Sequence, residues 1–312
     1  MHPDAPMSRP GLGLRLMMMA VTLLAIITLV FGMLRLAPGG PFDGERDLPP
    51  EIEANLKAAY HLDEPIVSQY FRYLGNLIQG DLGPSFRHQD FRVNELIAAG
   101  LPTSALLGTL SLLLALSLGL SLGVFGGMNP GSTLDNALMG FANLSIAAPT
   151  IITAPLMVLV FSIFLSWFPA GGDGGLMHYI LPSMALALPF AGAIARLVRA
   201  GVIECRLEPY IVTARAKGLP ERRIVYRHIL PIAILPVLSF LGPMAAALLT
   251  GSIVIEQVFD LPGIGRYFVQ AALNRDYTLV MGMVLVYSTL IVLFNFLVDL
   301  AYAWLDPRLK GA

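Results

Sequence analysis

The stretch SALLGTLSLLLALSLGLSLGVFGG, residues 104–127, decides the fold class of this chain. It contains no Asp, Glu, Lys or Arg, and it lies inside a gap of 39 residues between Glu95 and Asp135 that lacks all four. A helix needs about 20 apolar residues to cross ~30 Å of hydrocarbon. The run is long enough for that, and it is continuous rather than alternating, which excludes the pattern of a membrane β-barrel strand.

Five further gaps between charged residues are of similar length. They hold 19 residues between Arg15 and Arg35, 37 in 136–172, 22 between Asp173 and Arg196, 28 between Arg227 and Glu256, and 22 between Asp276 and Asp299. Backbone polar groups in lipid must be bonded within the segment, so each gap predicts a helix. The sequence therefore predicts six spans, at 16–34, 102–126, 137–166, 179–195, 232–255 and 279–304. Pro149 and Pro155 are expected to bend the third span.

The composition of the whole chain agrees with an integral membrane protein. Of 312 residues, 56% are hydrophobic and 13% are charged, against about 25% charged in a soluble domain. Mean hydropathy is +0.71. These values exclude a secreted disulfide scaffold, a disordered tail and a typical cytosolic enzyme. The single cysteine, Cys205, excludes an internal disulfide, and the net charge of −1 gives no reason to expect nucleic acid as a partner.

The distribution of basic residues predicts the orientation. With six spans, the side that holds both termini and the loop 196–231 carries 12 basic and 6 acidic residues, and the other side carries 8 basic and 14 acidic. Lys and Arg favour the cytoplasmic side, so both termini are expected inside. The first span is expected to be an uncleaved anchor and not a signal peptide, because Arg35 and Pro38 stand where a cleavage site needs small residues.

The segment after the first span is too long for a plain connection. Three stretches in it, 51–60, 65–78 and 91–100, have apolar residues at helical spacing, and Asp63–Glu64–Pro65 has the composition of a helix start. Two interpretations stay open for this extracytoplasmic helical segment. It is a small cap resting on the membrane face, or it is a docking platform or gate for something arriving from outside.

The loop 196–231 is expected to lie inside, and it carries eight basic residues. Pro209 can open a short helix, Gly218 can end it, and Pro220 follows, which is ordinary helix punctuation. ERRIVYRH, residues 221–228, then predicts a second short helix. The simpler interpretation is a positively charged anchor. The alternative is a rigid element that passes force from a soluble partner.

This loop resembles the EAA loop of ABC importer permeases. Gly218 and Leu230–Pro231 stand at the family spacing, while the triplet reads Val212–Thr213–Ala214 without its glutamate and the isoleucine position holds His228. The resemblance implies that coupling to an ATPase involves the following residues: Thr213, Ala214, Arg215, Ala216, Lys217, Gly218 and Leu219.

Longer segments are similar to the B-type permeases of oligopeptide ABC importers. They are APGGPFDGERDLPPEI (37–52), YHLDEPIVSQYFRYL (60–74), GDLGPSF (80–86), GSIVIEQVFDLPGIG (251–265), LNRDYTLV (273–280) and LDPRLK (305–310). The resemblance implies the type-1 ABC importer permease fold, a heterodimer with a sister C-type permease, two cytoplasmic ATPase subunits and an extracytoplasmic peptide-binding protein. The chain lacks GxxxxGK[ST], so ATP and Mg are expected on the ATPase subunits and no cofactor is expected on this chain.

Acidic residues in or beside spans are the remaining candidates. Glu256 at the outer end of the fifth span and Asp299 in the sixth are predicted to belong to the gate or translocation path, because charge inside a membrane is a functional hypothesis by default. For Asp299 an interfacial or helix-packing role is the alternative. No HExxH motif, paired-histidine motif or nucleophile motif occurs in the sequence, so neither a metal site nor a catalytic residue is predicted.

The sequence thus predicts an all-α membrane protein in four parts. These are a tail and first helix (1–35), an extracytoplasmic helical segment (36–93), a permease core (94–304) with its coupling loop (200–231), and a cytoplasmic tail (305–312). The expected function is passage of oligopeptides across the bacterial inner membrane, powered by ATP hydrolysis on partners. Alternatives are a permease for dipeptides or another peptide-like solute, a secondary carrier, and a membrane-embedded enzyme. No inverted repeat favours the carrier, and no constellation of reactive residues favours the enzyme.

Overall fold

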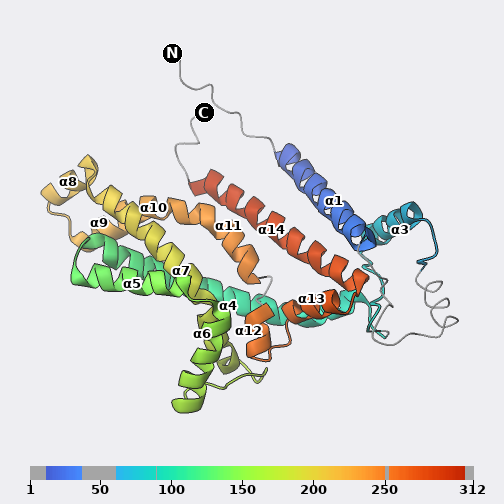
Figure 1. Ribbon diagram of the computed structural model, residues 1–312. Helices are drawn as coiled ribbons and strands as arrows, with labels where there is room; N and C mark the ends of the chain where they lie inside the picture. The colour runs from blue at the N-terminus through green and yellow to red at the C-terminus, as the bar shows by residue number, and fades with distance from the viewer. Residues whose placement is uncertain (1–11, 37–60, 89, 250–252, 306–312) are drawn as a thin grey trace. The chain divides into compact units, whose positions relative to one another are not determined.

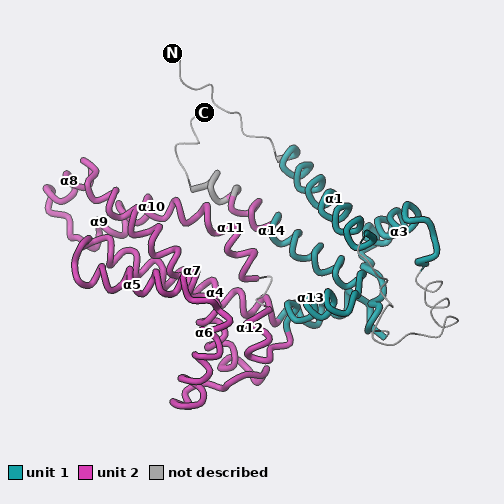
Figure 2. The backbone as a smooth tube through the Cα atoms, in the orientation of Figure 1, with its two compact units in different colours: residues 1–102, 263–292, 310–312 teal, residues 103–262, 293–309 magenta. Residues whose placement is uncertain are grey.

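The computed structural model describes residues 12–36, 61–88, 90–249 and 253–305. Within these ranges the chain is predominantly helical, and an isolated bridge between Pro84 and Arg92 provides the β pairing (Figure 1). The predicted all-α membrane architecture is confirmed. The residues divide into two compact units, and α4 and α14 each contribute to both (Figure 2). The units are described one at a time.

Unit 1 is built around the C-terminal half of the first helix. Its elements are α1 (Leu12–Leu36), α3 (Ile66–Ile78), the first turns of α4 (Val93–Met128), α13 (Ile264–Leu273) and the first half of α14 (Tyr277–Leu305). Ile27 and Phe31 of α1 pack with Met281 of α14. Other faces of α1 expose large apolar side chains such as Leu29 and Met33, as expected of a helix that faces lipid.

Unit 2 holds the remainder of α4, the end of α14 and the elements between them. These are α5 (Thr133–Ala147), α6 (Thr150–Met157), the π-helix η1 (Val158–Phe164), α7 (Met177–Arg206), α8 (Pro209–Ala216), α9 (Glu221–Ile224), the π-helix η2 (Val225–Ile229), α10 (Leu230–Ala233), α11 (Leu235–Leu249) and α12 (Ile253–Val258). The core of this unit forms mainly along α7, which has the longest run of buried residues.

Close approach of α4 to α7 depends on glycines at four-residue spacing, from Gly119 to Gly127. A Cβ on Gly119 would lie 2.6 Å from the Cβ of Ile194, and a Cβ on Gly123 would lie 2.6 Å from the Cβ of Val198. Real Cβ atoms do not approach so closely, so these positions admit only glycine at this helix separation. Small residues at such a spacing are the usual device for close packing of membrane helices.

Five of the six predicted spans are helices long and apolar enough to cross a membrane, with α11 and α12 together making the fifth in chain order. The third predicted span is instead two helical pieces, α5 and α6–η1, bent by 109°. Ala148 at the break is extended, with φ −77° and ψ 118°. The ring of Pro149 disfavours helical geometry in the residue before it, which explains the break. Pro155, the other predicted bend, lies inside α6 without ending it.

Several predicted boundaries need correction. The stretch 65–78 is helical from Ile66 onward, and Pro65, which we expected at the start of this helix, is its N-cap. The stretch 91–100 is no separate helix, because α4 runs without a break from Val93 through Pro102. The predicted inner loop begins as helix, since α7 continues to Arg206. The stretch 51–60 lies outside the described residues.

Candidate functional site

The segment after α7 has the predicted order of helix, glycine stop and second helix. Glu208 is extended, and Pro209 is the first residue of α8. An N–H at this position has no partner within the helix, so the missing N–H of proline costs no hydrogen bond. At the other end Gly218 has φ +75°. Its N–H donates to the carbonyl of Arg215 at 2.9 Å, and the N–H of Leu219 donates to that of Ala214 at 3.3 Å. This pair of bonds is the Schellman ending, in which a left-handed residue reverses the chain.

One face of this segment anchors it in unit 2. Ile211 and Ala214 of α8 are buried, as are Ile224 of α9 and Ile229 of η2. An ion pair between Arg215 Nε and Glu221 Oε1, 2.8 Å long, joins α8 to α9 across the turn. The position of α8 is therefore set by packing on both sides of the glycine.

The other face is exposed and partly apolar. Of the seven predicted coupling residues, Thr213, Ala216, Lys217 and Gly218 are exposed, while Arg215 and Leu219 are half-buried. Large apolar side chains on and beside the segment are exposed as well: Leu207, Tyr210, Val212 and Tyr226. Exposed apolar groups on a segment that also carries many charges are typical of a surface covered by another protein.

A partly buried ion pair fixes the base of the segment. Asp135 of α5 is almost fully buried, and Arg199 of α7 donates to its two oxygens at 2.6 and 2.7 Å. The N–H of Gly131 donates to the same carboxylate at 2.8 Å. Two turns further along α7, Arg206 donates to the carbonyl of Gly127 at 3.0 Å. The α4–α5 turn is thus bound to the part of α7 that leads into α8.

A groove of about 860 Å³ runs beside the same segment within unit 2. One wall is the C-terminal half of α4, from Ser117 to Met128, and the other is α9 with the residues up to Leu230. The exposed side chains of Phe125 and Tyr226 belong to these two walls. The groove is mostly apolar and contains the hydroxyl groups of two serines and the charges of Glu221 and Arg222.

Glu256 lies in α12, and its carboxylate is fully buried. Ser104 Oγ of α4 donates to Glu256 Oε1 at 2.6 Å. The chain just beyond α12 is held by Gly172, whose N–H donates to the carbonyl of Phe259 at 2.8 Å. A buried carboxylate needs such partners, because an unpaired one is very costly. In this arrangement Glu256 joins α12 to α4 inside unit 2 and has no exposed surface.

Asp299 lies in α14, but its side chain is outside what the structure describes, so its role stays a prediction. Asp276, in unit 1, was not among the sequence candidates. Its carboxylate accepts hydrogen bonds from Ser85 Oγ, from the N–H groups of Phe86 and Arg87, and from its own helix start at Leu279. An Asp just before an apolar run is a helix-cap signal, which predicts the last of these bonds and none of the others.

Metal-ligating and reactive side chains are scattered. Among the described residues there is no group of three or more His, Cys, Asp or Glu side chains that could hold a metal ion. Cys205 is a free and buried thiol in α7. The segment around α8 combines an exposed, partly apolar face, a buried face and ion pairs. It is therefore the candidate functional site of unit 2.

Comparison with known proteins supplies a family. Residues 116–311 match the family model described as binding-protein-dependent transport system inner membrane component. The chain is 49% identical over 291 residues to the oligopeptide transport system permease protein OppB of Salmonella typhimurium, covering 93% of this chain and 95% of that protein. It is 42% identical over 292 residues to the dipeptide transport system permease protein DppB of Bacillus subtilis, covering 94% and 95%.

Solved structures agree on the fold. The MetNI methionine ABC transporter in an inward-facing conformation has a chain that matches with a TM-score of 0.51 at 22% identity, over 68% of this chain and 96% of that one. An amino acid ABC transporter crystallised with histidines gives a TM-score of 0.51 at 18% identity, over 67% and 93%. At these identities the likeness concerns the fold alone. Together with the family match and the close relatives, it shows that this chain belongs to the binding-protein-dependent transport system inner membrane components, the permease subunits of ABC importers.

Proposed function

We propose that this chain is the B-type permease subunit of an ABC importer for oligopeptides. Members of its family are membrane components of transport systems and not enzymes. One observation carries the choice of solute: 49% identity to an oligopeptide permease spans nearly the whole length of both chains. The dipeptide permease of Bacillus subtilis is 42% identical over a similar length, so dipeptides are the second candidate.

The proposal gives each part of unit 2 a role. The exposed face of α8 and the Gly218 turn bind a cytoplasmic ATPase, and the Asp135–Arg199 pair carries the resulting displacement to the α4–α5 turn. The groove between α4 and α9–α10 is the inner part of the solute path. Glu256 holds α12 against α4 near the outer gate and does not contact solute, since its carboxylate is buried and bonded to Ser104.

The partners follow from the same proposal. They are a sister C-type permease, two cytoplasmic ATPase subunits that bind ATP and Mg, and an extracytoplasmic peptide-binding protein. The chain lies in the inner membrane with both termini in the cytoplasm, as the excess of basic residues in the segment 196–231 supports.

Reconstitution tests the function directly. The complex of both permeases, both ATPases and the binding protein in liposomes should take up labelled tri- to hexapeptides when ATP reaches the ATPases, and the lone chain should neither take up peptide nor hydrolyse ATP. Uptake of dipeptides in preference to longer peptides would select the second candidate. Uptake by the lone chain under a proton gradient would select a secondary carrier.

A further inference from the structure

Helix α3 of unit 1 has three sides of different character. The first side carries Tyr70, Tyr73 and Leu77, whose spacing of three and four residues places them in one row along the helix. They belong to the apolar cluster formed by Phe31 of α1 and Met281 of α14. This side therefore fixes α3 to the two long helices of its unit.

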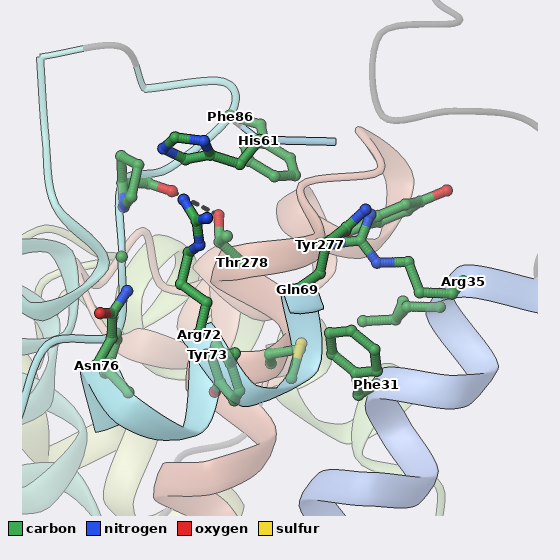
Figure 3. A pocket seen from close by; sticks show the side chains of 15 residues that line it. Phe31, Arg35, His61, Gln69, Arg72, Tyr73, Asn76, Phe86, Tyr277 and Thr278 are labelled. Carbon is green, nitrogen blue, oxygen red and sulfur yellow. Dashed lines mark hydrogen bonds between the residues drawn. The ribbon is translucent and has the colours of Figure 1, made fainter. Parts of the chain in front are cut away.

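The second side of α3 is polar. Gln69, Arg72 and Asn76 follow one another at the same helical spacing, and all three line a cavity of about 150 Å³ (Figure 3). Gln69 Nε2 donates to the carbonyls of Leu62 at 3.1 Å and Glu64 at 2.7 Å. The guanidinium of Arg72 pairs with the carboxylate of Glu64. The polar side is thus bonded to the turn that precedes the helix.

The third side is apolar and uncovered. Val67, Phe71, Leu74 and Ile78 are separated by four, three and four residues, so they form a second apolar row beside the first. Val67 and Phe71 are each 65% exposed, and Ile78 is 88% exposed. An amphipathic helix normally buries its whole apolar face. Here the described residues of unit 1 cover only half of that face.

The contact of α3 with α1 shows at which depth this row lies. The hydroxyls of Thr28 in α1 and Tyr70 in α3 lie 2.7 Å apart, and the rings of Phe31 and Tyr70 meet edge to face at 5.3 Å. Thr28 is seven residues before Arg35, which is about 10 Å along a helix. An arginine in the last turn of a span reaches for the membrane interface. The contact with α3 is therefore on the lipid side of that interface.

At this same level α1 itself presents apolar side chains outward. Leu29 is 65% exposed and Met33 is 70% exposed, as in a helix surrounded by acyl chains. An interfacial amphipathic helix inserts its apolar face about 5–10 Å into the boundary between headgroups and acyl chains. The depth of the contact agrees with that range, whereas a soluble protein approaches the headgroups from the water and does not reach it.

We propose that lipid acyl chains cover Val67, Phe71 and Ile78, so that α3 is an interfacial helix inserted in the leaflet at the C-terminal end of α1. On the topology proposed above this is the outer leaflet. The helix would hold the adjoining ends of α1 and α14 at a fixed depth in the membrane. Its apolar row would then not be available to a partner that arrives from outside.

Spin labels on single cysteines test the proposal in the full-length chain reconstituted in liposomes. In a Cys205→Ser background, Val67→Cys and Phe71→Cys each carry a nitroxide. Its relaxation is measured with oxygen, which concentrates among acyl chains, and with a water-soluble nickel chelate. Both labels should be relaxed severalfold more strongly by oxygen than by the nickel chelate. Two independent positions keep the test valid if one variant aggregates.

The matched control is Ser68→Cys. Ser68 is the exposed neighbour of Val67 but lies outside both apolar rows. Its label should be relaxed mainly by the nickel chelate, because it faces water. Gln79→Cys, exposed at the end of the helix, should behave in the same way.

Three results would overturn the proposal. Relaxation of the Val67→Cys and Phe71→Cys labels by nickel to the same extent as the Ser68→Cys label would mean that the row faces water. Shielding of both labels from both reagents would mean that protein covers the row, either residues 51–60 of the same chain or a second copy. Loss of oxygen access only after the sister permease or the binding protein is added would assign the row to that partner. The measurement on the single chain is independent of whether the assembled complex imports peptides.

Discussion

Gly218 ends α8 through its backbone conformation and not through lack of space. Its φ is +75°, and a Cβ built at this position would meet no atom within 4 Å. A β-branched residue in the left-handed region carries strain on the order of 1–3 kcal/mol, while Asn adopts this region readily. The substitutions Gly218→Val and Gly218→Asn therefore separate backbone strain from added bulk.

We expect Gly218→Val to insert and assemble, because the apolar spans are unchanged, but to lose coupling. Peptide uptake by the reconstituted complex should fall severalfold, and the ATP hydrolysis stimulated by loaded binding protein should be lost or should continue without uptake. Gly218→Asn should stay close to the wild type. Wild-type uptake by an assembled Gly218→Val complex would mean that this turn has no role in coupling and that the loop is only a positively charged anchor.

The Asp135–Arg199 pair gives a second prediction at this scale. Asp135→Asn leaves the guanidinium of Arg199 facing a neutral amide. The Arg199 side chain is 30% exposed, so water screens part of its charge, and we expect a cost on the order of 2 kcal/mol, below the ~3 kcal/mol of a fully buried pair. The melting temperature of the purified chain should drop on the order of 5 °C. Arg222→Gln, an exposed change in α9, should leave it unchanged. An unchanged melting temperature for Asp135→Asn would remove the pair from the account of how α8 is held.

Residues that act through local geometry were predictable, and those that act through distant partners were not. The punctuation Pro209, Gly218 and Pro220 lies within one short segment and has a meaning in any context. The partner of Asp135 is 64 residues away, and Ser85 is 191 residues from Asp276. Sequence spacing carries no information about which spans adjoin, so the pairing of these groups emerged only with the fold.

At the scale of elements, the contact between α4 and α7 sets a strict size limit. We expect Gly123→Leu to push the two helices apart, because even a Cβ would lie 2.6 Å from Val198, and overpacking costs about 1–3 kcal/mol. The matched change Gly140→Leu lies on α5, where no atom comes within 4 Å of an added Cβ. Size-exclusion profiles should show reduced folded yield for the first variant alone. Equal yields would mean that α4 and α7 are further apart than described.

Element existence was predictable from charge gaps, and element boundaries were not. A stretch without charged residues shows which part of a helix can lie in lipid. The helix itself can continue beyond that stretch, because charged residues are compatible with helical backbone outside the lipid. For this reason α7 continues to Arg206, beyond the last residue of its predicted span, and α4 begins at Val93 ahead of its own. Pro149 was expected to bend the third span, and only the structure shows that the bend reaches 109°.

At the scale of the whole molecule, labelling with an impermeant thiol reagent tests the orientation. Cys205 is buried, so the native thiol is a poor probe and should be replaced by serine. In that background Lys217→Cys, exposed beside Gly218, should be labelled only from the cytoplasmic side. Gln79→Cys, exposed at the end of α3, should be labelled from outside in intact cells. Labelling of Lys217→Cys from outside would reverse the proposed topology.

The bend at Pro149 determines whether the chain crosses the membrane an even or an odd number of times. Among the described residues, five spans are long and apolar enough to cross a membrane, one of them made of α11 and α12, and the bent pair could be a sixth. If the pair crosses, the number of crossings is even and the chain returns to the side on which it began. If the pair turns back, the number is odd, and everything from α7 onward is inverted, which would carry α8 to the face without ATP. The basic residues of 196–231 resist transfer outward, so they favour the crossing of a pair that geometry alone would allow to turn back. Pro149 and the basic residues of 196–231, far apart in sequence, thus jointly determine on which side of the membrane the second half of the chain lies.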